Sequence, residues 1–319
     1  MLKKILFFSF LTFFAQSGGC RDESKQPKPK EPTPVQTQTA NENKDNGNQN
    51  MSDSSSNKTP NTQSAFYETL NTILSKRGMS ANAICDGDDV VSRRILEEYG
   101  AMFMANEAVL VPPVCMFKSE QDVLSFQNQA GPRAANINGI KVELQASALN
   151  DLLAARAEAQ QQGLNITPRG GEAARRNFAD TIRLWDSRVK PALTYWQSKG
   201  RIPATDAARI RSLPMRDQVR EVLELEKQGI YFSTDFSKSI LYSVAAPGTS
   251  QHLSMLAFDA VEFGNPRVRQ ILARHGWFQT VKSDAPHFTY LGVKESELPS
   301  LGLRSVKVGE QVFWIPNVN

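Results

Sequence analysis

Two of the chain's three histidines lie in short segments near the C-terminus that also carry aspartates. Asp259 follows His252 by seven positions, and Asp284 precedes His287 by three. Two imidazoles and one carboxylate can hold a zinc ion and leave a fourth position open for water. A further carboxylate can take a proton from that water. These four residues predict a hydrolytic zinc site; the alternative is that both histidines are satisfied groups of the core.

The local sequence indicates how these side chains are positioned. The Pro-Gly pair at 247–248 favours a turn, because proline presets one dihedral angle and glycine accepts positive φ. That turn delivers His252 at the end of a loop, and residues 256–259 are expected to form a short buried strand. The spacing between the two ligands is too long for one helical turn, so a loop and a strand must bring them together. Ala285 precedes a proline, which favours an extended backbone and a strand over 286–291.

These segments resemble the VanY-type D-alanyl-D-alanine carboxypeptidases and related cell-wall endopeptidases, zinc peptidases of the LAS superfamily. That family carries Ser-x-His-x-x-Gly-x-Ala-x-Asp, then an acidic residue, two residues and a histidine. The chain matches this pattern at Ser250, His252, Ala257, Asp259, Asp284 and His287. The resemblance implies that one Zn²⁺ is held by His252, Asp259 and His287, with Asp284 as general base. It also implies that Ser250 hydrogen-bonds the terminal carboxylate of the substrate.

The order of elements upstream is also similar to that of the family. Apolar spacing predicts a helix over residues 146–162, and an extended segment follows at 164–168. By the resemblance, Arg176 falls on the arginine that binds the substrate carboxylate, a task that suits a planar guanidinium. Arg175 or Arg169 could hold that role instead. The alternative for these arginines is a solvated helix face.

The resemblance spans roughly residues 140–293 and implies an α+β fold, in which helices flank a small antiparallel sheet that carries the zinc site, as in D,D-peptidases. Met255 stands where the family has glycine, which implies a wider loop or an altered site. The implied substrates are peptidoglycan stem peptides, cleaved by D-alanyl-D-alanine carboxypeptidase activity. The alternatives are an endopeptidase of the same family and a wall-binding lipoprotein without turnover, which Met255 and the degenerate arginine motif would favour.

The N-terminus has the pattern of an export signal. Two lysines precede an apolar run at 5–15 that is too short for a persistent transmembrane span. Small residues before Cys20 resemble a bacterial lipoprotein signal, which would make Cys20 the lipidated membrane anchor; the alternative is plain secretion. We therefore expect a signal peptide at 1–20, a location facing the periplasm or cell envelope, and a disordered tether at 21–64, because almost nothing apolar is present there.

Length and composition allow one or two domains. The chain has 319 residues, is 40% hydrophobic and has a formal net charge of +4, which gives no argument for nucleic-acid binding. We expect an accessory region at 65–135 and a monomeric peptidase domain at 136–319. In an exported chain Cys85 and Cys115 are expected to form a disulfide; two reduced buried cysteines are the alternative.

Periodicity predicts the remaining elements. Helices are expected at 66–74, 90–100, 189–196, 215–228 and 266–274, and strands at 109–117 and within 304–315. The strands within 304–315 should extend the sheet at an edge. Residues 186–235 are longer than the resemblance requires. His275 ends a helix, so we interpret it as a partnered helix cap rather than as a metal ligand. Trp277 is expected beside the cleft.

Overall fold

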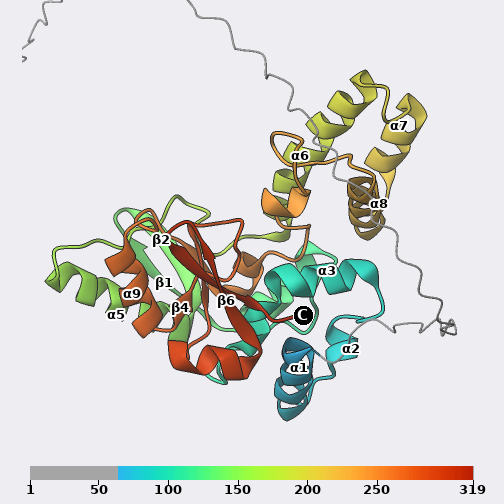
Figure 1. The fold of residues 1–319 in the computed structure, drawn as a ribbon. Helices are drawn as coiled ribbons and strands as arrows, with labels where there is room; N and C mark the ends of the chain where they lie inside the picture. The colour runs from blue at the N-terminus through green and yellow to red at the C-terminus, as the bar shows by residue number, and fades with distance from the viewer. Residues whose placement is uncertain (1–63, 319) are drawn as a thin grey trace, which may run out of the picture. The chain divides into compact units, whose positions relative to one another are not determined.

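The structure, a computed structural model, describes residues 64–318 and has an α+β architecture (Figure 1). Its strands form three small antiparallel sheets with the orders β1–β2, β3–β5–β4 and β6–β7. Helices flank these sheets, which confirms the coarse expectation for the fold class. The expected signal, the lipidated Cys20 and residues 21–63 of the expected tether lie outside the described residues. No helix within residues 64–318 has the length and apolarity needed to cross a membrane.

The three-stranded sheet is short and central. β3 (Ala257–Asp259) and β4 (Trp277–Phe278) pair with opposite edges of β5 (His287–Tyr290), and every one of these pairings is antiparallel. The strands predicted at 256–259 and 286–291 are therefore confirmed with slightly shorter bounds. All four residues of β5 are buried, so both faces of this strand are covered by other elements.

A helical layer lies beside the hairpin of β1 (Pro132–Ile137) and β2 (Ile140–Gln145). α5 (Ala146–Gln161) and α9 (Pro266–Arg274) are in contact, and each has the bounds predicted from its apolar spacing to within one residue. His275 follows α9 and its Nε2 lies 2.9 Å from Glu158 Oε2 on α5. The prediction of a partnered cap at His275 is confirmed.

The N-terminal region is mostly helical. Ser64 caps the first helix by accepting a hydrogen bond from the Tyr67 amide. The expected disulfide between Cys85 and Cys115 is present. Buried apolar side chains from both sides of residue 135 share one hydrophobic core. The elements of this region are α1 (Ala65–Lys76), α2 (Ala81–Ile84), α3 (Val90–Tyr99), η1 (Gly100–Met104) and α4 (Glu120–Gln129).

The strand predicted at 109–117 is wrong. This segment has no regular secondary structure, although Val111 and Phe117 are buried. Pro112 and Pro113 lack amide hydrogens, so they cannot donate to a strand ladder. The segment is held instead by single backbone bonds, such as the one from the Phe117 amide to the Gly248 carbonyl at 2.9 Å. It therefore packs against the loop that carries His252.

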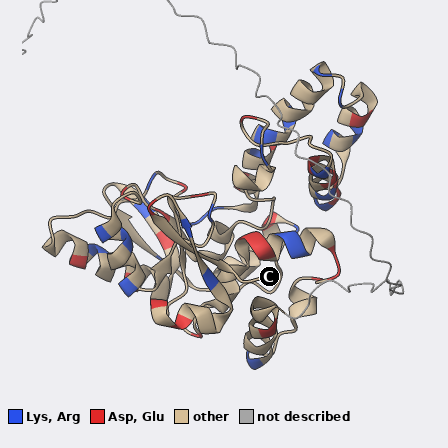
Figure 2. Cartoon of the chain, viewed as in Figure 1, with Lys and Arg blue, Asp and Glu red and all other residues tan. Residues whose placement is uncertain are grey.

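Residues 178–227 fold into three helices, α6 (Phe178–Ser198), α7 (Ala204–Ser212) and α8 (Met215–Lys227), which stand together in Figure 1. α6 begins earlier than the predicted helix at 189–196, because Asn177 and Asp180 form a capping box. Figure 2 shows that these helices carry both basic and acidic residues. The segment after α8 is irregular except for the 3₁₀ turn η2 (Ile240–Tyr242).

The C-terminal hairpin does not extend the central sheet, contrary to the prediction. β6 (Leu303–Val308) and β7 (Gln311–Pro316) form a sheet of their own after the 3₁₀ helix η4 (Glu295–Leu301). A backbone bond of 2.8 Å joins the Trp314 amide to the Gln279 carbonyl, one residue beyond β4. Because β4 spans only two residues, it offers too short an edge for a continuous ladder.

Candidate metal centre

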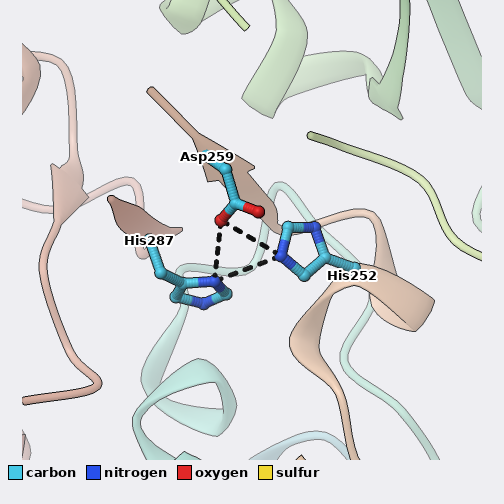
Figure 3. Close-up of side chains that lie close together, drawn as sticks. All are labelled: His252, Asp259 and His287. Carbon is cyan, nitrogen blue, oxygen red and sulfur yellow. Dashed lines mark hydrogen bonds and ion pairs between the residues drawn. The ribbon is translucent and has the colours of Figure 1, made fainter. Parts of the chain in front are cut away.

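His252, Asp259 and His287 bring three potential ligand atoms together (Figure 3). Asp259 Oδ1 lies 3.3 Å from His252 Nε2 and 3.3 Å from His287 Nδ1, and the two imidazole nitrogens are 3.2 Å apart. Asp259 and His287 are direct partners in the β3–β5 register. Directly opposed residues of antiparallel strands project to the same face, so this pairing places both side chains on one side of the sheet.

His252 comes from the 3₁₀ turn η3 (Gln251–Ser254), which follows the predicted Pro-Gly turn. Gly248 has φ 78°, and a Cβ there would lie 2.1 Å from the Phe117 carbonyl oxygen. Only glycine fits such a close approach of two backbone segments. Met255 ends the turn with φ 58° and ψ 32°, the left-handed conformation that glycine adopts most readily, and its side chain is fully buried. The backbone between the ligands thus keeps a conformation suited to glycine although a methionine is present.

A hydrogen bond to a backbone carbonyl sets the tautomer of His252. Its Nδ1 lies 2.7 Å from the Ala174 carbonyl oxygen. A carbonyl oxygen can only accept, so Nδ1 carries the proton and Nε2 presents a lone pair towards Asp259. Burial lowers the pKa of His252, which keeps the imidazole neutral and able to act as a ligand.

A chain of polar groups sets the tautomer of His287. The Gln251 side-chain amide donates to the Tyr99 carbonyl oxygen at 2.8 Å, which orients Gln251 Oε1 towards His287 Nε2, also at 2.8 Å. Nε2 must therefore be the protonated nitrogen, and Nδ1 presents a lone pair. Thr289 also donates to Gln251 Oε1. Thr280 Oγ1 is 2.6 Å from the Thr289 hydroxyl and extends the chain.

Asp259 completes the cluster as a carboxylate. Its Oδ2 accepts a hydrogen bond from Arg176 Nη2 at 2.8 Å. Its Oδ1 is buried and has no hydrogen-bond partner among the described residues. A buried, unpaired carboxylate oxygen is costly, so this atom calls for a positive partner.

The donor set and its spacing fit a small divalent cation. Two lone-pair nitrogens and one carboxylate oxygen face one another with no proton donor between them. Corners of a tetrahedron around an ion with bonds of ~2.0–2.1 Å are ~3.3–3.4 Å apart, close to the separations observed here. The hydrogen bonds to Ala174 and Gln251 are the kind of outer contacts that hold metal-binding histidines in place. His252, Asp259 and His287 could therefore hold a metal ion.

A cavity of about 240 Å³ opens at the cluster. His252 and His287 line it together with Ser250, which is buried, and Asp284, which is exposed. Ser250, implied to bind the substrate, and Asp284, implied to be the general base, therefore line the same cavity as the two histidines. Arg176 lines the cavity as well, although its Nη2 is engaged by Asp259. Its expected role in binding a substrate carboxylate stays a prediction.

Other residues named from the sequence lie elsewhere. Arg175 is paired with Glu143 at 3.4 Å, and Arg169 lies over the Phe263 ring at 6.0 Å. Neither lines the cavity. Trp277 is fully buried against Phe258 and Tyr290, so its expected place beside the cleft is wrong. Its ring, on the edge strand β4, is held in the core by these two aromatic rings of β3 and β5.

The sequence did not indicate the groups that orient the ligands. Gln251 is the neighbour of His252, yet nothing in its type suggests contact with His287. Thr289 lies two residues after His287, and the strand alternation that puts both on one face was a usable signal. The carbonyls of Ala174 and Tyr99 carry no side-chain signature, so only the tertiary structure could find them.

No protein-family profile, curated protein or solved structure matches the chain.

Proposed function

We propose that this protein is a zinc-dependent peptidase that cleaves peptidoglycan stem peptides, as a D-alanyl-D-alanine carboxypeptidase of the VanY type. The observation that carries the proposal is the buried triangle of two imidazole lone pairs and the unpaired Asp259 Oδ1, at 3.2–3.3 Å from one another. Such a triangle leaves one side of a bound ion open. The cavity lies on the side that His252 and His287 line.

Zinc suits this donor set, because it accepts nitrogen and oxygen ligands in tetrahedral sites. When bound, it would polarise a carbonyl and lower the pKa of a water molecule. The residues of the chain supply the rest. His252, Asp259 and His287 hold the ion, while Ala174 and Gln251 keep both imidazoles in the correct tautomer.

Asp284 is the proton acceptor in this proposal. Its side chain is exposed and lines the cavity, where it can take a proton from water and pass it to a leaving amine. Ser250 lines the same cavity and offers a hydroxyl to the peptide. Arg176 acts here as a positioning residue, because its bond to Oδ2 directs Oδ1 of Asp259 towards the histidines.

The loop between the ligands supports the relation to D,D-peptidases. Met255 occupies the place of the family glycine and keeps a left-handed backbone with φ 58°. The backbone at Met255 therefore has the left-handed conformation that a glycine at this position would adopt readily. The disulfide between Cys85 and Cys115 suits an oxidising compartment, in keeping with an exported lipoprotein anchored at Cys20.

Digestion of purified muropeptides by the full-length protein tests the proposal, with products identified by mass spectrometry. We expect the release of one terminal alanine, loss of this activity on adding a chelator, and restoration by Zn²⁺. His252→Ala should abolish the activity, and Asp284→Ala should reduce kcat by about 10²- to 10⁴-fold. An internal cut would assign the protein to the endopeptidases. No cleavage by the folded, zinc-loaded protein would refute the enzymatic proposal and favour a wall-binding role.

A further inference from the structure

One cationic side chain of the cavity has no acidic partner in the part of the chain that the structure describes. Arg188 lines the cavity from α6, and no Asp or Glu oxygen within residues 64–318 pairs with it at 4.0 Å or less. The nearby arginines differ in this respect. Arg175, Arg176 and Arg183 are paired with Glu143, Asp259 and Glu172, respectively. Arg188 therefore carries the uncompensated positive charge among the cavity's arginines.

The helix that carries Arg188 is fixed relative to the metal centre. Thr181, Leu184 and Arg188 follow a spacing of three and four residues, which places them on one face of α6, and all three line the cavity. The Gly248 amide donates to Thr181 Oγ1 at 3.2 Å. This bond ties α6 to the loop that leads into His252, so the helix that carries Arg188 and the loop that carries a ligand form connected parts of one cavity.

The guanidinium is oriented by hydroxyl groups that leave its charge intact. Arg188 Nε donates to Ser243 Oγ at 2.6 Å, and Nη1 donates to Ser187 Oγ at 2.8 Å. Ser243 Oγ lies 3.0 Å from Thr234 Oγ1, which holds it in turn. Neutral partners orient a cation without neutralising it. The remaining N–H groups are then available for an anionic ligand.

We infer that Arg188 binds the free terminal carboxylate of the peptide and selects substrates that end in one. A planar guanidinium recognises a carboxylate through two parallel hydrogen bonds. Arg176 is less suited to this task, because its Nη2 already pairs with Asp259. Apolar groups beside Arg188, among them Leu184, Val244 and Val281, would face small side chains such as that of alanine. This inference rests on the proposed peptidase function and assigns it to the carboxypeptidase branch.

A matched pair of substrates tests the inference. We would measure kcat/KM of the zinc-loaded, full-length protein for an acyl-peptide ending in D-Ala-D-Ala and for the same peptide with a C-terminal amide. Wild type should prefer the acid. Arg188→Ala should reduce that preference by about 10- to 100-fold while turnover of the amide stays the same. Arg188→Lys should keep part of the acid preference, because an ammonium group supplies the charge but cannot form two parallel hydrogen bonds to a carboxylate.

Arg183→Ala is the control on the same helix. Arg183 is 55% exposed and pairs with Glu172, so its removal should leave the preference unchanged. Ser243→Ala removes a neutral anchor of Arg188 and should lower the preference by about 5-fold. It provides a second variant if Arg188→Ala folds poorly. An unchanged acid preference in both Arg188→Ala and Ser243→Ala, or equal losses for acid and amide, would overturn the inference.

The two proposals can fail separately. If wild type hydrolyses neither peptide, calorimetric titration of the zinc-loaded protein with the same acid and amide replaces the rate measurement. Tighter binding of the acid that disappears in Arg188→Ala would support the carboxylate site even though the peptidase proposal had failed. Equal binding of acid and amide by wild type would overturn the carboxylate site. If the protein hydrolyses the acid preferentially and Arg188→Ala keeps that preference, the carboxylate site is overturned and the peptidase proposal stays intact.

Discussion

The two walls of the cavity are built differently. The metal wall consists of η3, β3 and β5, where His252 and His287 are 1% and 5% exposed and each faces a fixed hydrogen-bond partner. A second wall, here called the outer wall, comes from α6 and the irregular segment that contains Ser243, and hydroxyl groups orient its cation, Arg188. The metal wall is rigid because a strand register and a buried polar chain determine it. The outer wall depends on how the helices α6–α8 pack, so it is the place where specificity can change without loss of the metal site.

Removing a protein ligand of the metal should have the largest effect, and that effect should be on the metal wall. His252→Ala and His287→Ala each delete one of three protein ligands, so the zinc affinity should fall by at least about 1,000-fold. Competition with a chromophoric chelator would measure it. His275→Ala is the matched control: that imidazole pairs with Glu158, and its loss should leave zinc binding unchanged. Retention of zinc by either ligand variant would show that the metal wall is wrongly assigned.

Loss of the disulfide should reduce stability and leave the metal wall intact. The Cys85–Cys115 bond closes a loop with a sequence separation of 30. Replacing both cysteines with serine should lower the free energy of unfolding by about 2–4 kcal/mol, measured by urea denaturation. Zinc affinity at 25 °C should stay within a factor of about two, because no ligand or oriented imidazole contacts either cysteine. A tenfold loss of affinity would mean that the accessory region positions the ligands.

Gln251 should tune the metal wall without being a ligand. Gln251→Ala removes the acceptor that orients His287, and loss of such an outer contact typically costs about 10- to 100-fold in metal affinity. Gln218→Ala removes another buried glutamine, one that accepts from Trp185 far from the site. It should lower stability while metal affinity stays the same. If both variants lowered the metal affinity equally, the effect of Gln251→Ala would come from a general loss of stability and not from the orientation of His287.

Asp89 offers a smaller, pH-dependent test of how the helices α6–α8 pack on the rest of the protein. It caps α3 and pairs with Arg216 and Arg220 of α8. Burial acts to raise its pKa, but the Ser92 amide and the arginines outweigh burial and hold that pKa at about 2. A lowered pKa stabilises the fold above the ordinary value of 3.8, and this contribution is lost as the pH falls towards 2.

Asp89→Asn should therefore reduce the free energy of unfolding by about 1 kcal/mol at pH 7 and by almost nothing near pH 2, as measured by urea denaturation. Asp217 also pairs with Arg220 but is 50% exposed, so Asp217→Asn should have a smaller effect at every pH. A stability loss for Asp89→Asn that is equal at both pH values would exclude the ion pairs as its cause.

The sequence predicted the metal wall better than the outer wall. His252, Asp259 and His287 were recognisable because the resemblance that implied them rests on residue types and spacing within two short segments, which are local signals. Their convergence follows from one cross-strand pair, Asp259 with His287. The bounds of α5 and α9 were likewise predictable from apolar spacing and, for α9, from a proline at its start.

The errors have different physical causes, one local and two in tertiary packing. The strand expected at 109–117 was predicted from its apolar residues, and two prolines outweighed them. The hairpin of β6 and β7 could not be placed, since the edge it would have joined is only two residues long. Arg188 was not singled out, because its position depends on the whole of α6 and on the contact of Thr181 with Gly248.

X-ray absorption spectroscopy of the zinc-reconstituted, full-length protein tests the central claim most directly. We predict one zinc per chain, with two imidazole nitrogens and carboxylate oxygen among its ligands at ~2.0–2.1 Å. His275→Ala should give the same spectrum, and His287→Ala should lose it. Absence of stoichiometric zinc, or a spectrum that is unchanged in His287→Ala, would contradict the assignment of His252, Asp259 and His287 as the metal centre.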